Sequence, residues 1–319
     1  MSRKKKLIAS VFLISVFCML FSTTAFAGGL VDTMKKHLSG MLEDILTGTL
    51  DKNVLQPLYD IPSDLSSSTG AWGVVYSVFT GFFKPVSFSI VGMCFTVKMA
   101  QASSDLRNMT IEKYLTICLQ LVLCMFIVAK SDDLLKWIIQ IGLNAAQTVQ
   151  NTIIELLDKD VAGLLENAYP TAEDSNLWKG IKEVFTLVLD YLQLALPYVA
   201  YIIVSFAMKI AVYGVVIELM VRSALFPLFC GDIMLYGYEG RGFHSLKGFA
   251  ATALQCMVIV LIAGIVNGIN YTSLSNVVGA HTADIGGLVA SIGVVIVTDF
   301  AGFSLMMKAG QITREAIGA

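Results

Sequence analysis

The chain has 319 residues, of which 56% are apolar and only 14% are charged, and its mean hydropathy is +0.73. A disordered chain is polar, and an ordinary soluble domain carries about 25% charged residues, so this composition excludes the first class and disfavours the second. The net charge of −2 leaves no excess of positive charge for bulk nucleic-acid binding. We therefore predict an all-α fold, a polytopic membrane helical bundle with about five transmembrane helices after a signal peptide, plus amphipathic helices.

Residues 1–27 have the layout of a secretory signal peptide. Arg3 begins a basic run, Leu7–Phe21 is apolar, and Ala25-Phe26-Ala27 has the small-x-small form of a cleavage site. The apolar part is too short for a comfortable membrane span. We expect cleavage before Gly28, with an uncleaved signal anchor as the alternative. Both place the next segment outside the cytoplasm.

Residues 28–70 are predicted to form an extracytoplasmic amphipathic helix followed by a loop. Within Leu30–Leu50 the apolar residues recur at helical spacing, which suits either the outer membrane interface or a packing partner. The residues near one face are Leu30, Met34, Leu38, Leu42 and Ile45. Gln56–Gly70 contains two prolines and a serine run, which predicts a loop.

The apolar runs predict the membrane spans. Residues 71–129 are expected to hold two transmembrane helices, the first interrupted at Lys84-Pro85 because proline removes a backbone donor. Residues 130–184 are expected to be an extracytoplasmic helical segment with its own apolar periodicity at Leu134, Ile138, Ile141, Ala145, Val149 and Ile153. Residues 185–319 are expected to hold three transmembrane helices, a cytoplasmic loop 222–247 and a short cytoplasmic tail. The spans are predicted near 71–97, 111–129, 192–221, 248–269 and 285–307.

The third of these spans has an alternative reading. A split near Lys209 would divide it into two and give six spans instead of five. No turn-forming residues lie at that point, so we predict one long helix with an amphipathic lead-in from Leu177.

The orientation follows from the signal peptide and from the distribution of basic residues. Five spans place the protein in the cytoplasmic (inner) membrane with its mature N-terminus outside and its C-terminus in the cytoplasm. The outer loop Asn270–Asp284 has no lysine or arginine, as the positive-inside rule expects. The basic residues of the predicted inner loops and inner span ends are Lys98, Arg107, Lys113, Arg222, Arg241, Lys247, Lys308 and Arg314.

We find no sequence motif for catalysis or for cofactor binding. The chain lacks GxxxxGK[ST], GxSxG and HExxH patterns, and none of its six cysteines pairs at CxxC spacing. Gly237–Phe243 is glycine-rich, but it does not follow the dinucleotide fingerprint and is interpreted as a flexible inner loop. We predict a protein without enzymatic activity, and we assign no cofactor and no metal.

Ionisable residues inside apolar segments are the candidate intramembrane polar sites, because such groups are costly there unless paired or wet. They are Lys84, Lys209, Glu218 and Asp299. Glu218 and Arg222 are four residues apart and are expected to pair on one helix face, where a structural role at the cytoplasmic interface accounts for both. Asp299 lies inside the fifth span and is expected to make a buried polar contact between helices, with a pore role as the alternative. Asn267 and Asn270 end the fourth span.

One segment carries a family resemblance. Val221-Arg-Ser-Ala-Leu-Phe-Pro-Leu-Phe-Cys-Gly-Asp-Ile233 leads into Gly240-Arg-Gly-Phe-His-Ser-Leu-Lys-Gly-Phe249 and then into the fourth span. This pattern resembles the TrbL-type polytopic membrane subunit of conjugative type IV secretion systems, in the form carried by Gram-positive integrative elements. The layout agrees over residues 30–315, and only residues 221–249 are motif-like.

The resemblance implies a non-enzymatic inner channel or scaffold subunit that helps single-stranded DNA, with its attached relaxase, cross the cytoplasmic membrane. The implied partners are the secretion ATPase, the other secretion subunits and membrane lipid. The resemblance leaves open whether the chain also forms a homo-oligomer. The implied partner-contact residues of the inner loop are Arg222, Pro227, Asp232, Gly242 and Lys247. The outer segment 130–184 would face the translocation route or an outer partner.

Direct DNA contact rests on the resemblance alone, since the sequence shows no basic and aromatic stacking platform. The alternative function is an autonomous small-solute transporter or membrane pore. Transporters often repeat a broken helix in both halves, and the break at Lys84-Pro85 has no clear counterpart, which disfavours this alternative.

Overall fold

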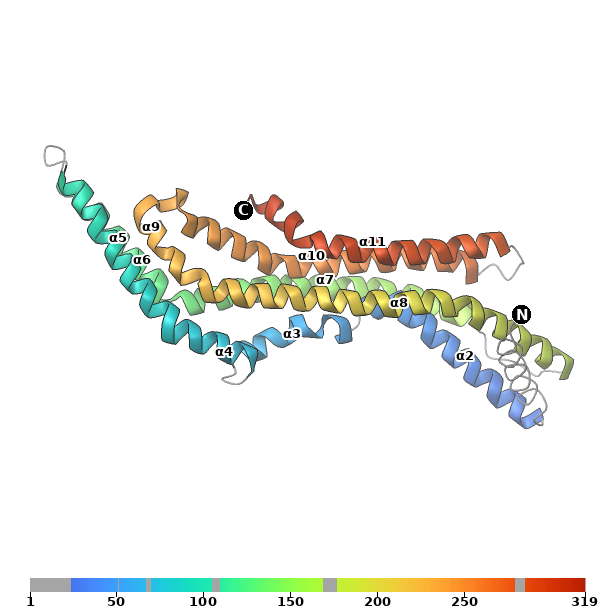
Figure 1. Ribbon diagram of the computed structural model, residues 1–319. Helices are drawn as coiled ribbons and strands as arrows, with labels where there is room; N and C mark the ends of the chain where they lie inside the picture. The colour runs from blue at the N-terminus through green and yellow to red at the C-terminus, as the bar shows by residue number, and fades with distance from the viewer. Residues whose placement is uncertain are drawn as a thin grey trace, which may run out of the picture. The chain divides into compact units, whose positions relative to one another are not determined.

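The computed structural model describes residues 24–50, 52–66, 70–104, 110–168, 177–278 and 285–318. The described residues form helices, with no strand among them, as the sequence predicted (Figure 1). Most of the predicted signal peptide lies outside these residues, and the first described helix, α2 (Thr24–Thr47), begins just before its expected cleavage site.

The helices follow one another with short connections. After α2 come η1 (Gly48–Leu50), α3 (Lys52–Ser66), α4 (Ala71–Val78), the π-helical turn η2 (Phe79–Phe83), α5 (Lys84–Ser104), α6 (Ile111–Ala129), α7 (Ser131–Ala168), α8 (Leu177–Leu225), η3 (Phe226–Phe229), α9 (Cys230–Tyr236), η4 (Gly237–Glu239), α10 (Arg241–Val278) and α11 (Ile285–Ile317).

Five helices or helix pairs among the described residues are long and apolar enough to cross a membrane, which confirms the predicted number of spans. They cover Ala71–Ser104, Ile111–Ala129, Leu194–Tyr236, Arg241–Ser275 and Ile292–Ile317. The predicted long third helix is confirmed, because α8 continues without interruption through Lys209 from Leu177 to Leu225.

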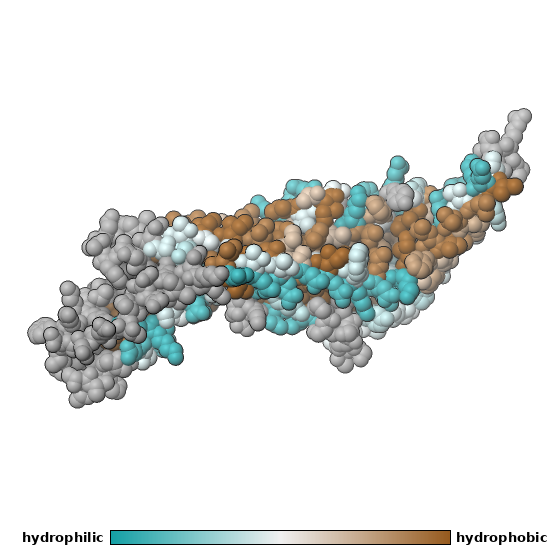
Figure 2. Space-filling model, turned by 180° about the vertical axis from the view of Figure 1, so that it is seen from behind, coloured by the Kyte–Doolittle hydropathy of each residue, from teal (hydrophilic) through white to brown (hydrophobic). Residues whose placement is uncertain are grey.

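The spans differ in how much of each the chain itself covers. Within the most apolar windows, 67% of the α10 residues are buried but only 17% of those in the first two spans, so α10 is the most buried of the five candidate spans. The uncovered side chains are large and apolar, as on Leu119 of α6 and Phe206 of α8, and they give the protein the extensive apolar surface seen in Figure 2. Such a surface suits contact with lipid or with apolar partner helices.

The contacts divide the chain into two compact units, and α7, α8, α10 and α11 contribute to both. The first unit comprises Met1–Thr49, Leu156–Ile203 and Asn267–Asp299, and the second comprises Leu50–Glu155, Val204–Val266 and Phe300–Ala319.

The core of the first unit is built on the amphipathic face of α2. Leu38, Leu42 and Ile45 of the predicted face are fully buried, and they pack with Leu187 of α8 and Val295 of α11. We had expected this face to meet either the outer membrane interface or a packing partner. The packing partner is present, and it is formed by other helices of the same chain.

The second unit contains α3, which corrects our prediction of a loop over Gln56–Gly70. Residues Lys52–Ser66 are helical despite the prolines, and only the end of the predicted loop lies outside the helix. Val54, Leu58 and Ile61 recur at helical spacing and are buried. Burying this apolar face outweighs the backbone hydrogen bonds that the prolines remove, since each buried side chain contributes about 1.5–3 kcal/mol.

In the second unit α7 packs closely along α10. A Cβ atom at Gly142 would lie 2.7 Å from the carbonyl carbon of Ala253, and one at Gly264 would overlap the side chain of Ile153. Both pairs have the same offset along the sequence, so the two helices run parallel in one register. The middle of α7 therefore lies alongside α10, which is one of the five candidate spans.

The predicted helix is confirmed, and its buried apolar residues include a second row beside the one that begins at Leu134. This second row comprises Leu135, Ile139, Leu143 and Ala146. Apolar residues occupy both rows. The row beside Gly142 is the one that allows the backbones of α7 and α10 to approach each other.

Candidate functional site

The segment 222–247, which carries the family resemblance, is an ordered helical cap and not the open loop that we predicted. It comprises the end of α8, then η3, α9, η4 and the first turns of α10, and its side chains at Phe226, Cys230 and Met234 are almost fully buried. We refer to residues 222–247 as the cap. This apolar core explains why the segment is ordered. The glycines of the segment had led us to predict a flexible loop.

A charged cluster closes the cap where α8 ends. The Arg222 guanidinium donates to the Glu218 carboxylate over 2.8 Å, so the predicted i,i+4 pair is present. Arg314 of α11 donates to the same carboxylate, a contact that the sequence did not reveal. One carboxylate thus holds two guanidinium groups from two helices, and the cluster keeps a net positive charge at the surface.

Pro227 and Asp232 have local roles in the cap. Pro227 lies in the first turn of η3, where the missing backbone N–H removes no hydrogen bond. Asp232 lies in the first turn of α9, where a negative charge interacts favourably with the helix dipole. Both positions are explained by folding of the cap, and neither requires a partner.

Glycine and lysine residues fix the second half of the cap. Gly237 has φ of +62°, a backbone conformation that favours glycine. A Cβ at Gly242 would lie 2.6 Å from the Ile233 side chain and would also overlap the Phe229 carbonyl oxygen, so the start of α10 packs directly on η3 and α9. The Lys247 ammonium lies 5.4 Å from the centre of the Phe243 ring, within range of a cation–π contact.

Lys98 of α5 ties the cap to the preceding hairpin. Its ammonium donates to the Met234 carbonyl over 2.8 Å and to the Gln120 side chain of α6 over 2.6 Å. The last carbonyls of α9 lack partners within the helix, and Lys98 supplies one. We had counted Lys98 only as an inner positive charge, because nothing in the sequence links it to a residue so far along the chain.

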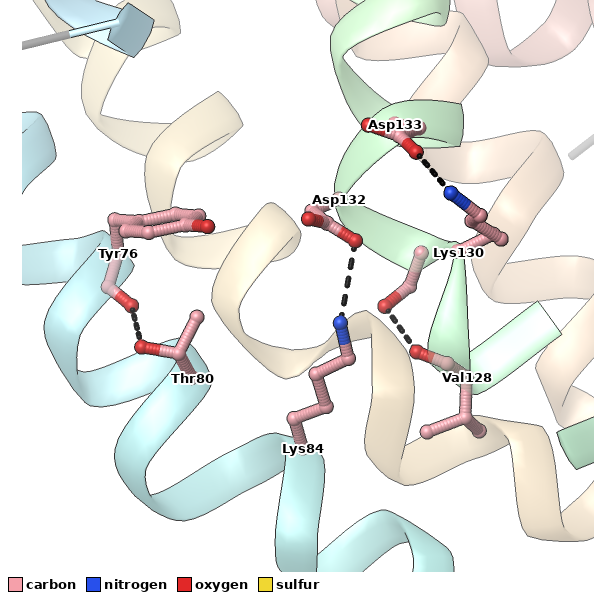
Figure 3. Close-up of polar contacts among 8 residues, drawn as sticks. Tyr76, Thr80, Lys84, Val128, Lys130, Asp132 and Asp133 are labelled. Atoms are coloured by element: carbon pink, nitrogen blue, oxygen red, sulfur yellow. Dashed lines mark hydrogen bonds and ion pairs between the residues drawn. The ribbon is translucent and has the colours of Figure 1, made fainter. Parts of the chain in front are cut away.

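Lys84 is paired near the break in the first span. The π-helical turn Phe79–Phe83 precedes Pro85, at the interruption that we predicted, and the Lys84 ammonium lies 3.2 Å from the Asp132 carboxylate (Figure 3). Asp132 follows the end of α6 closely, so the Lys84–Asp132 pair lies at the base of the α5–α6 hairpin, and Lys84 is within the candidate span Ala71–Ser104. Residues Lys84–Ser104 alone are about 31 Å long, enough to cross a bilayer.

A pocket lies beside this pair in the second unit. Trp72, Tyr76 and Phe79 line one side of it, and Leu135 and Ile139 of α7 line the other. The Lys136 ammonium lies 5.6 Å from the Tyr76 ring centre. The lining is mainly aromatic and aliphatic, so the pocket suits an apolar group, such as a lipid chain, better than a polar ligand.

Asp299 and Lys209 are the remaining predicted intramembrane residues. Asp299 is 1% exposed and accepts a hydrogen bond of 2.7 Å from the Asn270 amide of α10, so the predicted contact between helices is present. Lys209 is half-buried on α8. The predicted sites therefore do not converge on one centre. They fall into the cap, the Lys84–Asp132 pair and the Asp299–Asn270 contact.

The sequence analysis missed a polar stripe on α7. Between Lys136 and Glu155 this helix has no charged residue, and Gln140, Asn144, Gln147 and Asn151 are all exposed along one side. Helical spacing puts these residues on one face, which we call the polar stripe. The uncharged run was visible in the sequence, but the packing of α7 along a candidate span was not.

Within the described residues no group of three or more histidine, cysteine or acidic side chains is arranged to hold a metal ion. Comparisons with protein-family models, with curated proteins and with solved structures found no match to this chain.

Proposed function

We propose that this chain is a non-enzymatic inner channel or scaffold subunit of a conjugative type IV secretion system. It resides in the cytoplasmic membrane with its mature N-terminus outside and its C-terminus in the cytoplasm, and it helps single-stranded DNA with its relaxase to cross. Its partners are the secretion ATPase, the other secretion subunits and lipid. The function rests on the resemblance of residues 221–249 together with the packing of α7.

The observation that carries the channel part of the proposal is the polar stripe. Gln140, Asn144, Gln147 and Asn151 are exposed on a helix that packs along α10, a candidate span. Lipid offers no hydrogen bonds to side-chain amides, so such a face needs water or polar partner groups. A passage for a hydrophilic polymer supplies water, and the lack of charge avoids trapping a polyanion at any one point.

The cap supports the subunit part of the proposal. Its fold buries Phe226 and Met234, while the charged cluster that Arg222 forms with Glu218 and with Arg314 of α11 stays partly exposed and carries net positive charge. A rigid, positively charged surface beside the membrane suits docking of a cytoplasmic partner with acidic groups. A flexible loop would lose more conformational entropy on binding than this ordered cap does.

An autonomous transporter or pore is the second candidate, and one observation favours it. Asp299 is a buried carboxyl group within a candidate span, and such groups commonly mark ion or proton pathways. The polar stripe fits this candidate as well as the first. The two candidate functions therefore differ in the partner proteins and in the transported molecule, and not in the presence of a pore.

Purification from the native donor cells in a mild detergent tests the proposal. We expect tagged protein to bring the secretion ATPase and other transfer subunits with it, identified by mass spectrometry. Exchange of Arg222 and Arg314 for glutamine should weaken this recovery, while the matched exchange of Lys130, an exposed residue outside the cap, should not. A homo-oligomer without transfer proteins would favour the transporter candidate.

A further inference from the structure

Asp299 and Asn270 form a buried polar contact between α10 and α11 in the first unit. Asp299 is 1% and Asn270 0% exposed, and the amide nitrogen of Asn270 donates to one carboxyl oxygen of Asp299 over 2.7 Å. Two acceptor atoms of the pair remain without a donor: the other carboxyl oxygen of Asp299 and the amide oxygen of Asn270. Buried acceptors of this kind are costly, and together they need an explanation.

One proton accounts for both unsatisfied atoms. If it is bound to the second oxygen of Asp299, that oxygen becomes a donor, and the amide oxygen of Asn270 is its complementary acceptor. Together with the observed hydrogen bond, this second bond would close a ring in which acid and amide each donate once and accept once. An ionised Asp299 would instead keep a full negative charge in the span with a single neutral donor, which is the costlier state.

The described residues offer no neighbouring charge that would compensate an ionised Asp299. Among the described residues Asp299 takes part in no ion pair. The described titratable groups on the parts of α2, α8 and α10 in the same unit are Asp32, Lys35, Lys36, His37, Glu43, Asp44, Tyr191, Tyr198, Tyr201 and Tyr271. The carboxylate of Asp44 accepts from Tyr198, so this acid is engaged away from Asp299.

We propose that Asp299 binds a proton at neutral pH and that the neutral acid–amide pair with Asn270 joins α10 to α11. The proton is in effect a bound ligand of the span. The pair lies close along the chain to Leu274 and Val295, which belong to the core of the first unit, so it fixes the register of two helices where that core forms. This inference does not depend on the secretion function and applies equally to a transporter.

The Asp299→Asn variant separates a proton site from a cation site. An asparagine at 299 both donates and accepts, so it keeps the two hydrogen bonds without any proton or ion. We expect the apparent melting temperature of the full-length variant in nanodiscs to stay within about 2 °C of the parent, while Asp299→Leu lowers it by roughly 3–8 °C. Equal losses in both variants would overturn the proposal.

Infrared spectroscopy provides an independent readout that does not depend on stability. The full-length protein at neutral pH should show the carbonyl stretching band of a protonated buried carboxylic acid, and Asp299→Asn should abolish it. Asp133→Asn, a change at an exposed acid, is the matched control and should leave the band intact. Absence of the band in the parent, or a melting temperature that rises when sodium replaces choline, would show an ionised Asp299 and overturn the proposal.

Discussion

Substitution of Gly142 by alanine tests the packing of α7 along α10, on which the channel proposal depends. The new Cβ would lie 2.7 Å from the carbonyl carbon of Ala253, a backbone atom that cannot rotate away. Ordinary contact requires about 3.5 Å, so the helices must separate by roughly 0.8 Å, and a gap of that size forfeits a quarter to a half of each interhelical contact. Overpacking of this kind costs about 1–3 kcal/mol, occasionally more.

Helix propensity acts in the opposite direction at this position. Alanine is favoured over glycine inside a helix by about 1 kcal/mol. If the clash costs about 3 kcal/mol, the gain in helix propensity leaves a net loss of about 2 kcal/mol in the free energy of unfolding of the Gly142→Ala protein. This loss corresponds to a fall in melting temperature of roughly 4–8 °C for a unit of this size.

The matched control is Gly214→Ala in α8. A Cβ at Gly214 would meet no atom within 4 Å, so only the gain in helix propensity applies, and the melting temperature should stay level or rise. Thermal stability of both variants can be followed in one detergent by fluorescence-detected size exclusion. If Gly142→Ala proves as stable as Gly214→Ala, α7 does not pack against α10 as described, and the polar stripe no longer supports the channel proposal.

Three further predictions concern the second unit. Replacing Lys98 with methionine removes the donor to the end of α9, should cost about 1–3 kcal/mol, and should speed hydrogen exchange over residues 230–236. A double-mutant cycle with alanine at Lys84 and Asp132 should give a coupling of about 1 kcal/mol, and a value near zero would contradict the partly buried pair. Burial raises the pKa of Tyr59 from 10.0 to about 12, so its contribution to stability is present below pH 10 and is lost as the pH rises toward 12. Ultraviolet titration should therefore show a late-ionising tyrosine whose signal disappears in the Tyr59→Phe variant.

Hydropathy and charge were sufficient to predict the helical membrane fold. Apolar windows are a local property, so the spans and the continuity of α8 through Lys209 could be predicted from the chain alone. The i,i+4 pair of Glu218 and Arg222 is equally local, and it is present. For the same reason the amphipathic face of α2 was predicted correctly.

Long-range packing could not be predicted in the same way. The Lys98 contact with α9 and the addition of Arg314 to Glu218 join residues far apart in sequence, and no spacing rule indicates them. The α3 helix was missed because local turn signals at two prolines were outweighed by tertiary burial. The packing of α7 along α10 was not predicted either, because its close contacts, such as Gly142 with Ala253, join residues more than a hundred positions apart.

The role of the stripe can be measured directly during DNA transfer. A photo-crosslinking amino acid is placed at Asn144 or Gln147, and the matched control is placed at Ile265, an exposed apolar residue of α10. Donor cells are irradiated while they transfer DNA, and the tagged protein is recovered under denaturing conditions. The channel proposal predicts transferred-strand DNA attached through positions 144 and 147, dependent on the secretion ATPase, and none through 265. Equal or absent crosslinking at all three positions in a strain that transfers DNA normally would contradict it.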